Sequence, residues 1–189
     1  GDVDQDGFLG AAVAELDLAA RLLGSRRVET VFFGGGTPTM LPAEALTGLL
    51  GAMQDRFDLA PDAEVTTEAN PETLTPAYLA TLREGGFTRL SLGLQSVVPH
   101  VLRVLERVHT PTRGLDAARW AKDAGFDHIS LDLIYGTPTE SLDDWRASLD
   151  AVTSTPVDHV SAYSLIVEDG TRLARQVRRG EIAMPDDDD

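Results

Sequence analysis

The sequence contains no cysteine among its 189 residues. The chain itself therefore supplies no disulfide bond and no thiolate ligand for zinc or for an iron–sulfur cluster. It also has no apolar run near the roughly 20 residues needed to cross a bilayer, and no charged start followed by an apolar stretch. We expect neither a membrane-spanning segment nor secretion, and we expect a cytoplasmic location.

Positive charge is scarce as well. Against 31 acidic residues there are 16 basic ones, giving a net charge of −15. Such a chain repels a phosphate backbone unless its basic residues gather on one face. One cluster, made of Arg172, Arg175, Arg178 and Arg179, precedes the acidic end Asp186 to Asp189 and is typical of a solvated helix face. We expect no nucleic-acid partner.

What the sequence does have is enough apolar residues, 42%, for one domain with a sizeable core. Helical spacing and strand-like runs alternate along it. Helix patterns include Leu9 to Leu23, ended by Gly24, and a capping-box start at Ser141 and Asp144. The predicted strands are 28–33, 63–68, 87–93, 126–133 and 157–165. Strands separated by single helices run parallel, which predicts an α/β fold, either a doubly wound sheet or a β/α barrel.

A glycine-rich loop follows the first predicted strand: Gly34-Gly35-Gly36-Thr37-Pro38-Thr39. Glycines let the backbone approach a ligand closely, yet the same residues also make ordinary tight turns, so the loop alone leaves both interpretations open. Glu68, Gln95 and Asp132 lie at or near the ends of the next three strands. Any one of them is more commonly a helix cap, but in a barrel the carboxyl ends of the strands form the active site. Their convergence favours the barrel.

Four segments carry a resemblance to a known family: 33–39, 67–71, 91–96 and 132–138. In order and spacing they resemble the oxygen-independent coproporphyrinogen III oxidase-like branch of radical S-adenosylmethionine (SAM) proteins. Segments 163–171 and 178–181 are more similar to the heme chaperones of that branch (HemW) than to its decarboxylating oxidases. The resemblance implies a partial (β/α) TIM-like barrel lacking its first strand, with residues 1–189 forming a single partial core domain of the second to sixth β/α units. It also implies that the cluster-binding N-terminal segment and a C-terminal domain are absent.

The resemblance implies cofactors as well. In the family, three cysteines spaced Cys-x3-Cys-x2-Cys hold a [4Fe-4S] cluster, and SAM chelates its fourth iron. This chain has none of these cysteines. We therefore expect a fragment that forms the SAM-binding wall of a longer protein of heme or porphyrin metabolism, with heme or a porphyrin as a further partner. The fragment alone is expected to be inactive.

The resemblance assigns a role to each candidate residue. Gly35, Gly36 and Thr37 face the methionine amino group. Glu68 accepts from an ammonium or hydroxyl group, Gln95 pairs with a ribose hydroxyl and Asp132 accepts from one. Arg107 reaches the cofactor carboxylate, for which a planar guanidinium is suited. Without the family, Arg107 is typical of a solvent-facing helix arginine and Asp132 of a loop cap.

Other interpretations stay open. A non-redox β/α domain binding a phosphate or nucleotide is one, although no Gly-x4-Gly-Lys-Ser/Thr motif occurs; a ligand-free structural fragment is another, and a porphyrinogen oxidase a third. Two aromatic residues at strand ends, Tyr135 and Tyr163, are expected in the core more often than on a ligand ring. The strand at Val28 to Phe33 is expected to expose an apolar edge that promotes self-association. The histidines lack paired metal-ligand spacing and are expected to be ordinary surface or edge residues; they are His100, His109, His128 and His159.

Overall fold

The computed structural model describes residues 4–107, 110 and 112–183. Its strands are β1 Arg27–Phe33, β2 Asp58–Ala69, β3 Arg89–Gln95, β4 His128–Tyr135 and β5 His159–Ser164. The α-helices are α1 Gln5–Leu23, α2 Ala43–Gln54, α3 Pro76–Glu84, α4 Pro99–Val104, α5 Arg113–Asp123, α6 Leu142–Thr153 and α7 Arg172–Arg178. Short 3-10 helices, η1 Pro38–Met40 and η2 Pro71–Thr73, follow β1 and β2. The predicted features at His109 and at Asp186 to Asp189 lie outside the described residues.

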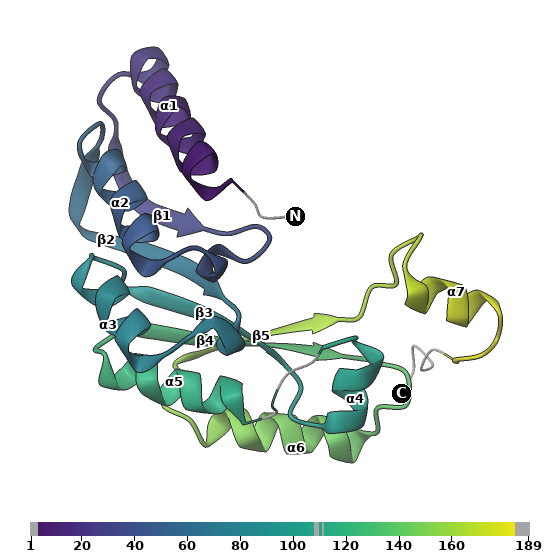
Figure 1. Ribbon diagram of the computed structural model, residues 1–189. Helices are drawn as coiled ribbons and strands as arrows, with labels where there is room; N and C mark the ends of the chain where they lie inside the picture. Colours follow the sequence, from purple (N-terminus) through teal and green to yellow (C-terminus); the bar gives the residue numbers. More distant parts are fainter. Residues whose placement is uncertain (1–3, 108–109, 111, 184–189) are drawn as a thin grey trace.

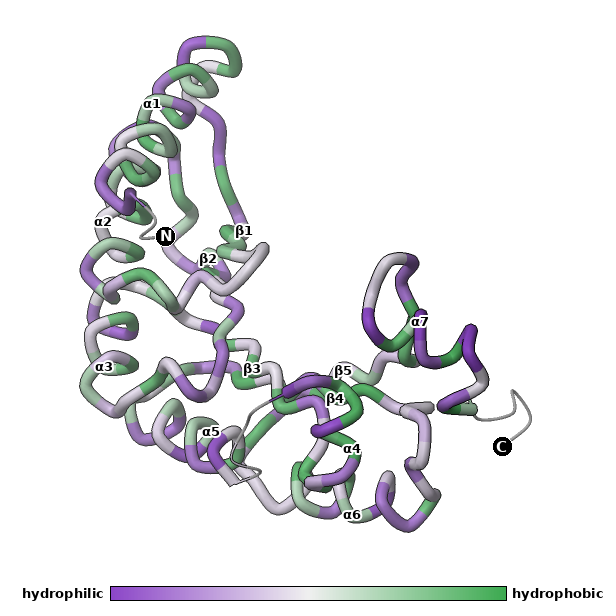
Figure 2. The backbone as a smooth tube through the Cα atoms, turned by 45° about the vertical axis from the view of Figure 1, so that its right-hand side comes forward, coloured by the Kyte–Doolittle hydropathy of each residue, from purple (hydrophilic) through white to green (hydrophobic). Residues whose placement is uncertain are grey.

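The strands form one sheet in the order β1-β2-β3-β4-β5, and every neighbouring pair is parallel. This sequential order distinguishes the barrel from a doubly wound sheet, whose strand order reverses. The chain bends into an open arc, with α1, α2, α3, α5 and α6 along its outer side and the strands along its inner side (Figures 1 and 2). The predicted α/β partial barrel is confirmed.

The two faces of the sheet differ in polarity because apolar and polar residues alternate along β3 and β4. Leu90, Leu92 and Leu94 of β3 are buried in the core beneath the helices. Ser91, Gly93 and Gln95, the residues between and after them, lie on the opposite, inner face, since successive side chains of a strand point to opposite faces. Most fully parallel sheets are apolar on both faces. Here the inner face is polar and is the one that positions the site.

Local sequence signals explain where several helices begin. Thr75 caps α3 by accepting from the backbone N–H of Tyr78, and Ser141 and Asp144 form the predicted capping box of α6. Some boundaries differ from those predicted. β2 begins at Asp58, five positions before the predicted start, because its first two residues pair with Arg27 and Val28. The sequence pattern predicts a helix from about Pro99 to Val108, whereas α4 ends at Val104.

The sheet has two edge strands, and both are poorly covered. In β1 the side chain of Phe32 is 64% exposed, as expected for an apolar edge. No residue of β5 and no residue of α1 is fully buried. Over the described ranges, no helix is both long and apolar enough to span a membrane.

Candidate functional site

A pocket opens on the inner face of the sheet at the carboxyl ends of the strands. It is lined by Gly36, Thr37, Pro38, Glu68, Ala69, Asn70, Ser91, Gly93, Gln95, Arg107 and Asp132. Six of the seven predicted site residues are among them. The seventh, Gly35, does not line the pocket but contacts one of its walls, as described next. The structure therefore brings together residues spread over about half of the chain.

The glycine loop is tied to the end of the next strand. The backbone N–H of Gly35 donates a hydrogen bond to the Oε2 atom of Glu68 at 3.1 Å. Gly35 and Gly36 have φ angles of 82° and 55°, in the left-handed region that favours glycine. Because nothing lies within 4 Å of where a Cβ would stand at either residue, the backbone conformation rather than crowding requires these glycines. Glu68 therefore holds the loop in place and keeps its second carboxylate oxygen for other groups.

Gln95 sits at an irregularity of the sheet. The register between β3 and β4 shifts between Gly93 and Gln95, and Gln95 itself has φ 68°, an uncommon value for a residue with a side chain. A Cβ added at Gly93 would stand 3.0 Å from the Nε2 atom of Gln95. The absence of a side chain at Gly93 thus leaves room for the Gln95 amide against the sheet.

Asp132 is positioned by two serines on the inner face. Ser91 donates a hydrogen bond from Oγ to Asp132 Oδ2 at 2.9 Å, and Ser130 donates to Oδ1 at 3.5 Å. Asp132 pairs across the sheet with Gly93, so no side chain covers it from that side. The carboxylate is oriented by its neighbours and half-buried, which suits it to accept from a ligand hydroxyl or ammonium group.

Arg107 reaches the pocket from the segment after α4. Its backbone N–H donates to the carbonyl of Leu102 at 2.9 Å, which closes the end of that helix, and Glu106 before it has φ 53°. Its side chain is exposed and lines the pocket beside the two carboxylates. The pocket therefore combines one cation with Glu68 and Asp132, an arrangement that suits a zwitterionic ligand better than a polyanion.

An apolar pocket continues from the same wall. It shares Glu68, Gln95 and Asp132 and adds Ile134, Leu165 and Ile166 together with Tyr163 and Ser164. The expectation that Tyr135 and Tyr163 are core residues is wrong. Tyr163 is 57% exposed on the edge strand β5, and Tyr135 is 42% exposed where it packs on Trp145, with ring centroids 5.6 Å apart. Tyr135 is covered only in part by Trp145 of α6, and Tyr163 belongs to a strand with no buried residue.

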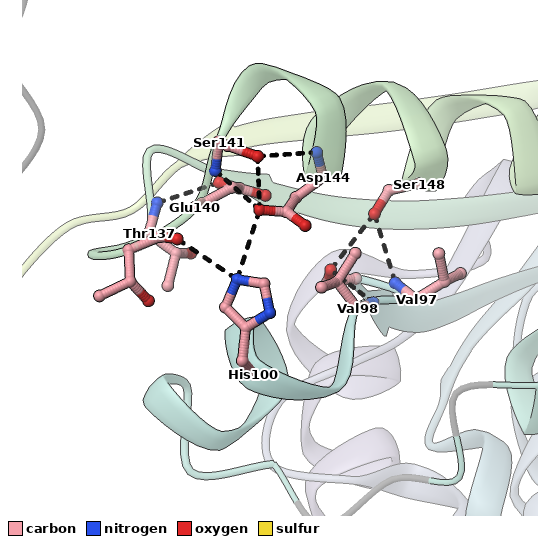
Figure 3. Close-up of polar contacts among 10 residues, drawn as sticks. Val97, Val98, His100, Thr137, Glu140, Ser141, Asp144 and Ser148 are labelled. Atoms are coloured by element: carbon pink, nitrogen blue, oxygen red, sulfur yellow. Dashed lines mark hydrogen bonds and ion pairs between the residues drawn. The ribbon is translucent and has the colours of Figure 1, made fainter.

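The loop between β4 and α6 contains a linked set of polar groups (Figure 3). The backbone N–H of Thr137 donates to Glu140 Oε2 at 3.1 Å, and burial raises the pKa of the Glu140 carboxyl. Hydrogen bonds from Ser141 lower the pKa of Asp144. Asp144 Oδ2 lies 3.3 Å from the Nε2 atom of His100, which is also 3.3 Å from the carbonyl oxygen of Thr139. Helix α4 is therefore fastened to the start of α6.

The described histidines lie at the surface or at strand ends. His100 contacts Asp144, His128 contacts Asp158, and His159 is exposed at the start of β5. Across residues 4–107, 110 and 112–183, no group of three or more His, Asp or Glu side chains is arranged to hold a metal ion.

Five residues of the pocket wall are not among the predicted site residues: Pro38, Ala69, Asn70, Ser91 and Gly93. Ser91 and Gly93 were visible in principle, because the run Leu90-Ser91-Leu92-Gly93-Leu94-Gln95 alternates strictly and predicts that Ser91, Gly93 and Gln95 share a face. Asn70 has a structural role, since its side chain accepts from the N–H of Glu72 and caps η2.

A family model described as the radical SAM superfamily matches residues 12–152. The chain belongs to this superfamily. The heme chaperone HemW of Mycobacterium tuberculosis (strain ATCC 25618 / H37Rv) is 57% identical over 188 residues, an alignment that covers 100% of this chain and 48% of that protein. The mitochondrial radical S-adenosyl methionine domain-containing protein 1 of Bos taurus is 37% identical over 184 residues, covering 97% of this chain and 42% of its own length.

Among solved structures, the radical SAM enzyme coproporphyrinogen III oxidase (HemN) of Escherichia coli superimposes with a TM-score of 0.87 at 27% identity. The superposition covers 97% of this chain and 42% of HemN. Both comparisons agree with the resemblance read from the sequence motifs. The chain spans about half the length of the curated relatives it matches, 48% for the bacterial protein and 42% for the mitochondrial one.

Proposed function

We propose that this chain is the SAM-binding part of a radical SAM protein of heme metabolism, of the heme-chaperone (HemW) type. Membership of the radical SAM superfamily and the 57% identity to a HemW support the assignment. The main observation behind this proposal is that one pocket is lined by the glycine loop together with Glu68, Gln95, Arg107 and Asp132. The domain assignment belongs to the same proposal: residues 1–189 form a single partial core, the second to sixth β/α units.

The donor set fits the organic part of SAM. Arg107 offers a guanidinium for the cofactor carboxylate, while the free oxygen of Glu68 suits its ammonium group. Gln95, at the end of β3, can donate to and accept from a ribose hydroxyl, and Asp132 of β4 can accept from one. Gly36 and Thr37 bring backbone close to the methionine end.

The residues do not fit the cluster. A [4Fe-4S] cluster is held by cysteine thiolates, and the 189 residues contain none. In radical SAM proteins that cluster supplies the electron for reductive cleavage of SAM. We therefore propose that these residues bind and orient the cofactor, and that the ligands of the cluster come from sequence outside them.

Two alternatives have less support. The likeness to HemN favours a coproporphyrinogen III oxidase, but the structural match is only 27% identical, against 57% for the heme chaperone. A phosphate or nucleotide ligand would face the carboxylates of Glu68 and Asp132 with Arg107 as the one cation of the pocket wall, within the described residues. At such short range that charge balance opposes a polyanion.

The test is isothermal titration calorimetry of the 189-residue chain with SAM and, separately, with ATP. We expect SAM to bind and ATP not to bind. Glu68→Gln keeps an acceptor for the Gly35 N–H but removes the charge, and we expect it to weaken SAM roughly tenfold, the loss of one charge-assisted hydrogen bond. Glu84→Gln, on the exposed face of α3, is the matched control. ATP binding, or equal SAM affinity in both variants, would contradict the proposal.

A second measurement addresses inactivity. The chain is incubated with SAM and a strong reductant, and 5′-deoxyadenosine is quantified by chromatography. We expect none above the protein-free control, because the chain offers no thiolate for a cluster. Production of 5′-deoxyadenosine by these residues alone would overturn this part of the proposal while leaving SAM binding intact.

A further inference from the structure

A second pocket lies apart from the proposed SAM site, between α4, the loop after β4 and α7. It is lined by His100, Arg103 and Val104 of α4, by Thr139, and by Arg172 and Gln176 of α7. Figure 1 shows α7 beyond the end of β5, at the same end of the arc as α4. The two pockets are close along the chain, since Glu106 lines this one and Arg107 lines the other.

The charge of this second pocket is opposite to that of the molecule. The chain carries a net charge of −15, yet the pocket presents the guanidinium groups of Arg103 and Arg172 against a single carboxylate, that of Glu106. Glu106 Oε1 lies 3.3 Å from Arg172 Nη1. The proposed SAM pocket has the reverse balance, with two carboxylates and one arginine. The charges of the lining residues therefore favour an anion more in the second pocket than in the first.

The wall of the second pocket is held in place by the contacts in Figure 3. His100 Nε2 is 3.3 Å from Asp144 Oδ2 and 3.3 Å from the carbonyl oxygen of Thr139. Both partners are acceptors, so Nε2 carries the hydrogen and the ring orientation is fixed. Ser141 donates in turn to Asp144 at 2.7 Å. Helix α4, and Arg103 on it, is thus positioned by α6.

The pocket is not purely polar. Val104 and Ile182 contribute apolar surface between the basic residues. A small inorganic anion would leave this surface in contact with water. A ligand that combines carboxylates with a flat apolar body would cover it, because arginine forks bind carboxylates in two-point contacts while the apolar atoms are removed from water.

We propose that this pocket binds the carboxylate groups of an amphiphilic dicarboxylate, and, resting on the proposed heme-chaperone function, that the ligand is a tetrapyrrole held through its two propionates. Arg103 and Arg172 contact the propionates, and Val104 and Ile182 pack against the macrocycle. Glu106 competes with the ligand for Arg172. The tetrapyrrole is bound beside the SAM pocket and leaves Arg107 available to the cofactor.

The test compares protoporphyrin IX with its dimethyl ester, in which both propionates are blocked. Binding to the 189-residue chain is followed by the absorbance of the porphyrin and by quenching of the fluorescence of Trp120 and Trp145. We expect the free acid to bind at least about tenfold more tightly than the ester, the effect of losing charge-assisted contacts. We expect Arg103→Gln and Arg172→Gln each to weaken the acid several-fold and to leave the ester unchanged.

Two further variants make the test specific. Glu106→Gln removes the competing carboxylate, so we expect it to tighten the acid about threefold, an effect no loss of folding would mimic. Arg119→Gln, on α5 and paired with Asp116, removes the same charge outside the pocket and should change neither ligand. Equal binding of acid and ester, no binding of the acid, or the same effect for Arg103→Gln and Arg119→Gln would each overturn the proposal. SAM calorimetry is a separate measurement, so SAM binding with failed porphyrin discrimination would reject this site alone.

Discussion

Glu68 and Gly35 are joined by a hydrogen bond of 3.1 Å from the glycine N–H to the Oε2 atom of the carboxylate, across 33 positions of the chain. The end of β2 thereby fixes the loop after β1. Glu68 therefore holds the loop in place, in addition to its proposed contact with the ligand. This hydrogen bond also explains why the loop can keep consecutive left-handed residues at an exposed position, since one end of its backbone is held from outside.

The first prediction concerns the backbone of that loop. Gly35→Ala places a side chain at φ 82° without any clash, so its cost is the left-handed conformation itself, roughly 1–2 kcal/mol of unfolding free energy. Gly48→Ala in α2, at an exposed position with nothing within 4 Å, should instead stabilise by roughly 0.5–1 kcal/mol. Urea denaturation followed by circular dichroism measures both. Changes of the same sign would show that the loop conformation is not as described.

The second prediction concerns Gln95. Gly93→Ala brings a Cβ to 3.0 Å from Gln95 Nε2, so the amide must move while the strand pairing remains. We expect SAM affinity to fall about three- to tenfold, the range for losing one hydrogen bond, with little change in melting temperature. Calorimetry measures the first quantity and thermal unfolding the second. Gly51→Ala in α2 is the control, and unchanged affinity in Gly93→Ala would remove Gln95 from the proposed ribose contact.

The sequence predicted the parallel α/β order and the residues that meet at the strand ends, because both follow from local patterns. Leu90, Leu92 and Leu94 alternate with polar or small residues, and three consecutive glycines indicate the loop after β1. Whether Arg107 reaches the pocket was not readable from composition or periodicity. It depends on where α4 ends, and the predicted helix continued past the residue where the chain turns at Glu106.

Other features depend on contacts between distant segments. The start of β2 is set by its pairing with β1. The sequence does not predict this start, because Pro61 interrupts the strand-like run. The helical spacing from Leu46 to Phe57 predicts that Phe57 belongs to the apolar face of a helix. Helix α2 instead ends at Gln54, and Phe57 lies between it and β2. The positive φ of Gln95 occurs at the register shift between β3 and β4, and a glutamine at this position does not predict a positive φ.

The third prediction is a pH dependence at Glu140. Burial raises the pKa of this carboxyl, although backbone hydrogen bonds from Thr137 and Gly136 lower it in part. A carboxyl whose pKa is higher in the folded than in the unfolded state destabilises the fold when ionised. The penalty is absent below the unfolded pKa and is complete above the folded one.

Glu140→Gln removes this charge and keeps an acceptor for the Thr137 N–H. We expect it to raise the unfolding free energy at pH 7 by about 0.5 kcal/mol, a small gain because the side chain is partly exposed. The gain should disappear below about pH 4, where glutamate is protonated in both states. Urea titrations from pH 3.5 to 7.5 measure it, with the exposed Glu84→Gln as control. A gain that grows as the pH falls would contradict the assigned burial effect.

The fourth prediction concerns the free edge of the sheet. Phe32 is 64% exposed on β1, whose outer side has no neighbouring strand in the described part of the chain. Apolar edge strands pair with other chains, so we expect the sedimentation coefficient to rise with protein concentration. Phe32→Lys should weaken this self-association roughly tenfold or more, since burial of a phenylalanine stabilises by about 1.5–3 kcal/mol and a charge resists pairing. Leu142→Lys, which charges an equally exposed apolar site on α6, should leave it unchanged. If both variants reduce self-association equally, general surface hydrophobicity drives the association and the edge of β1 does not. If the unmodified chain is a monomer at all concentrations, the prediction of edge pairing is wrong.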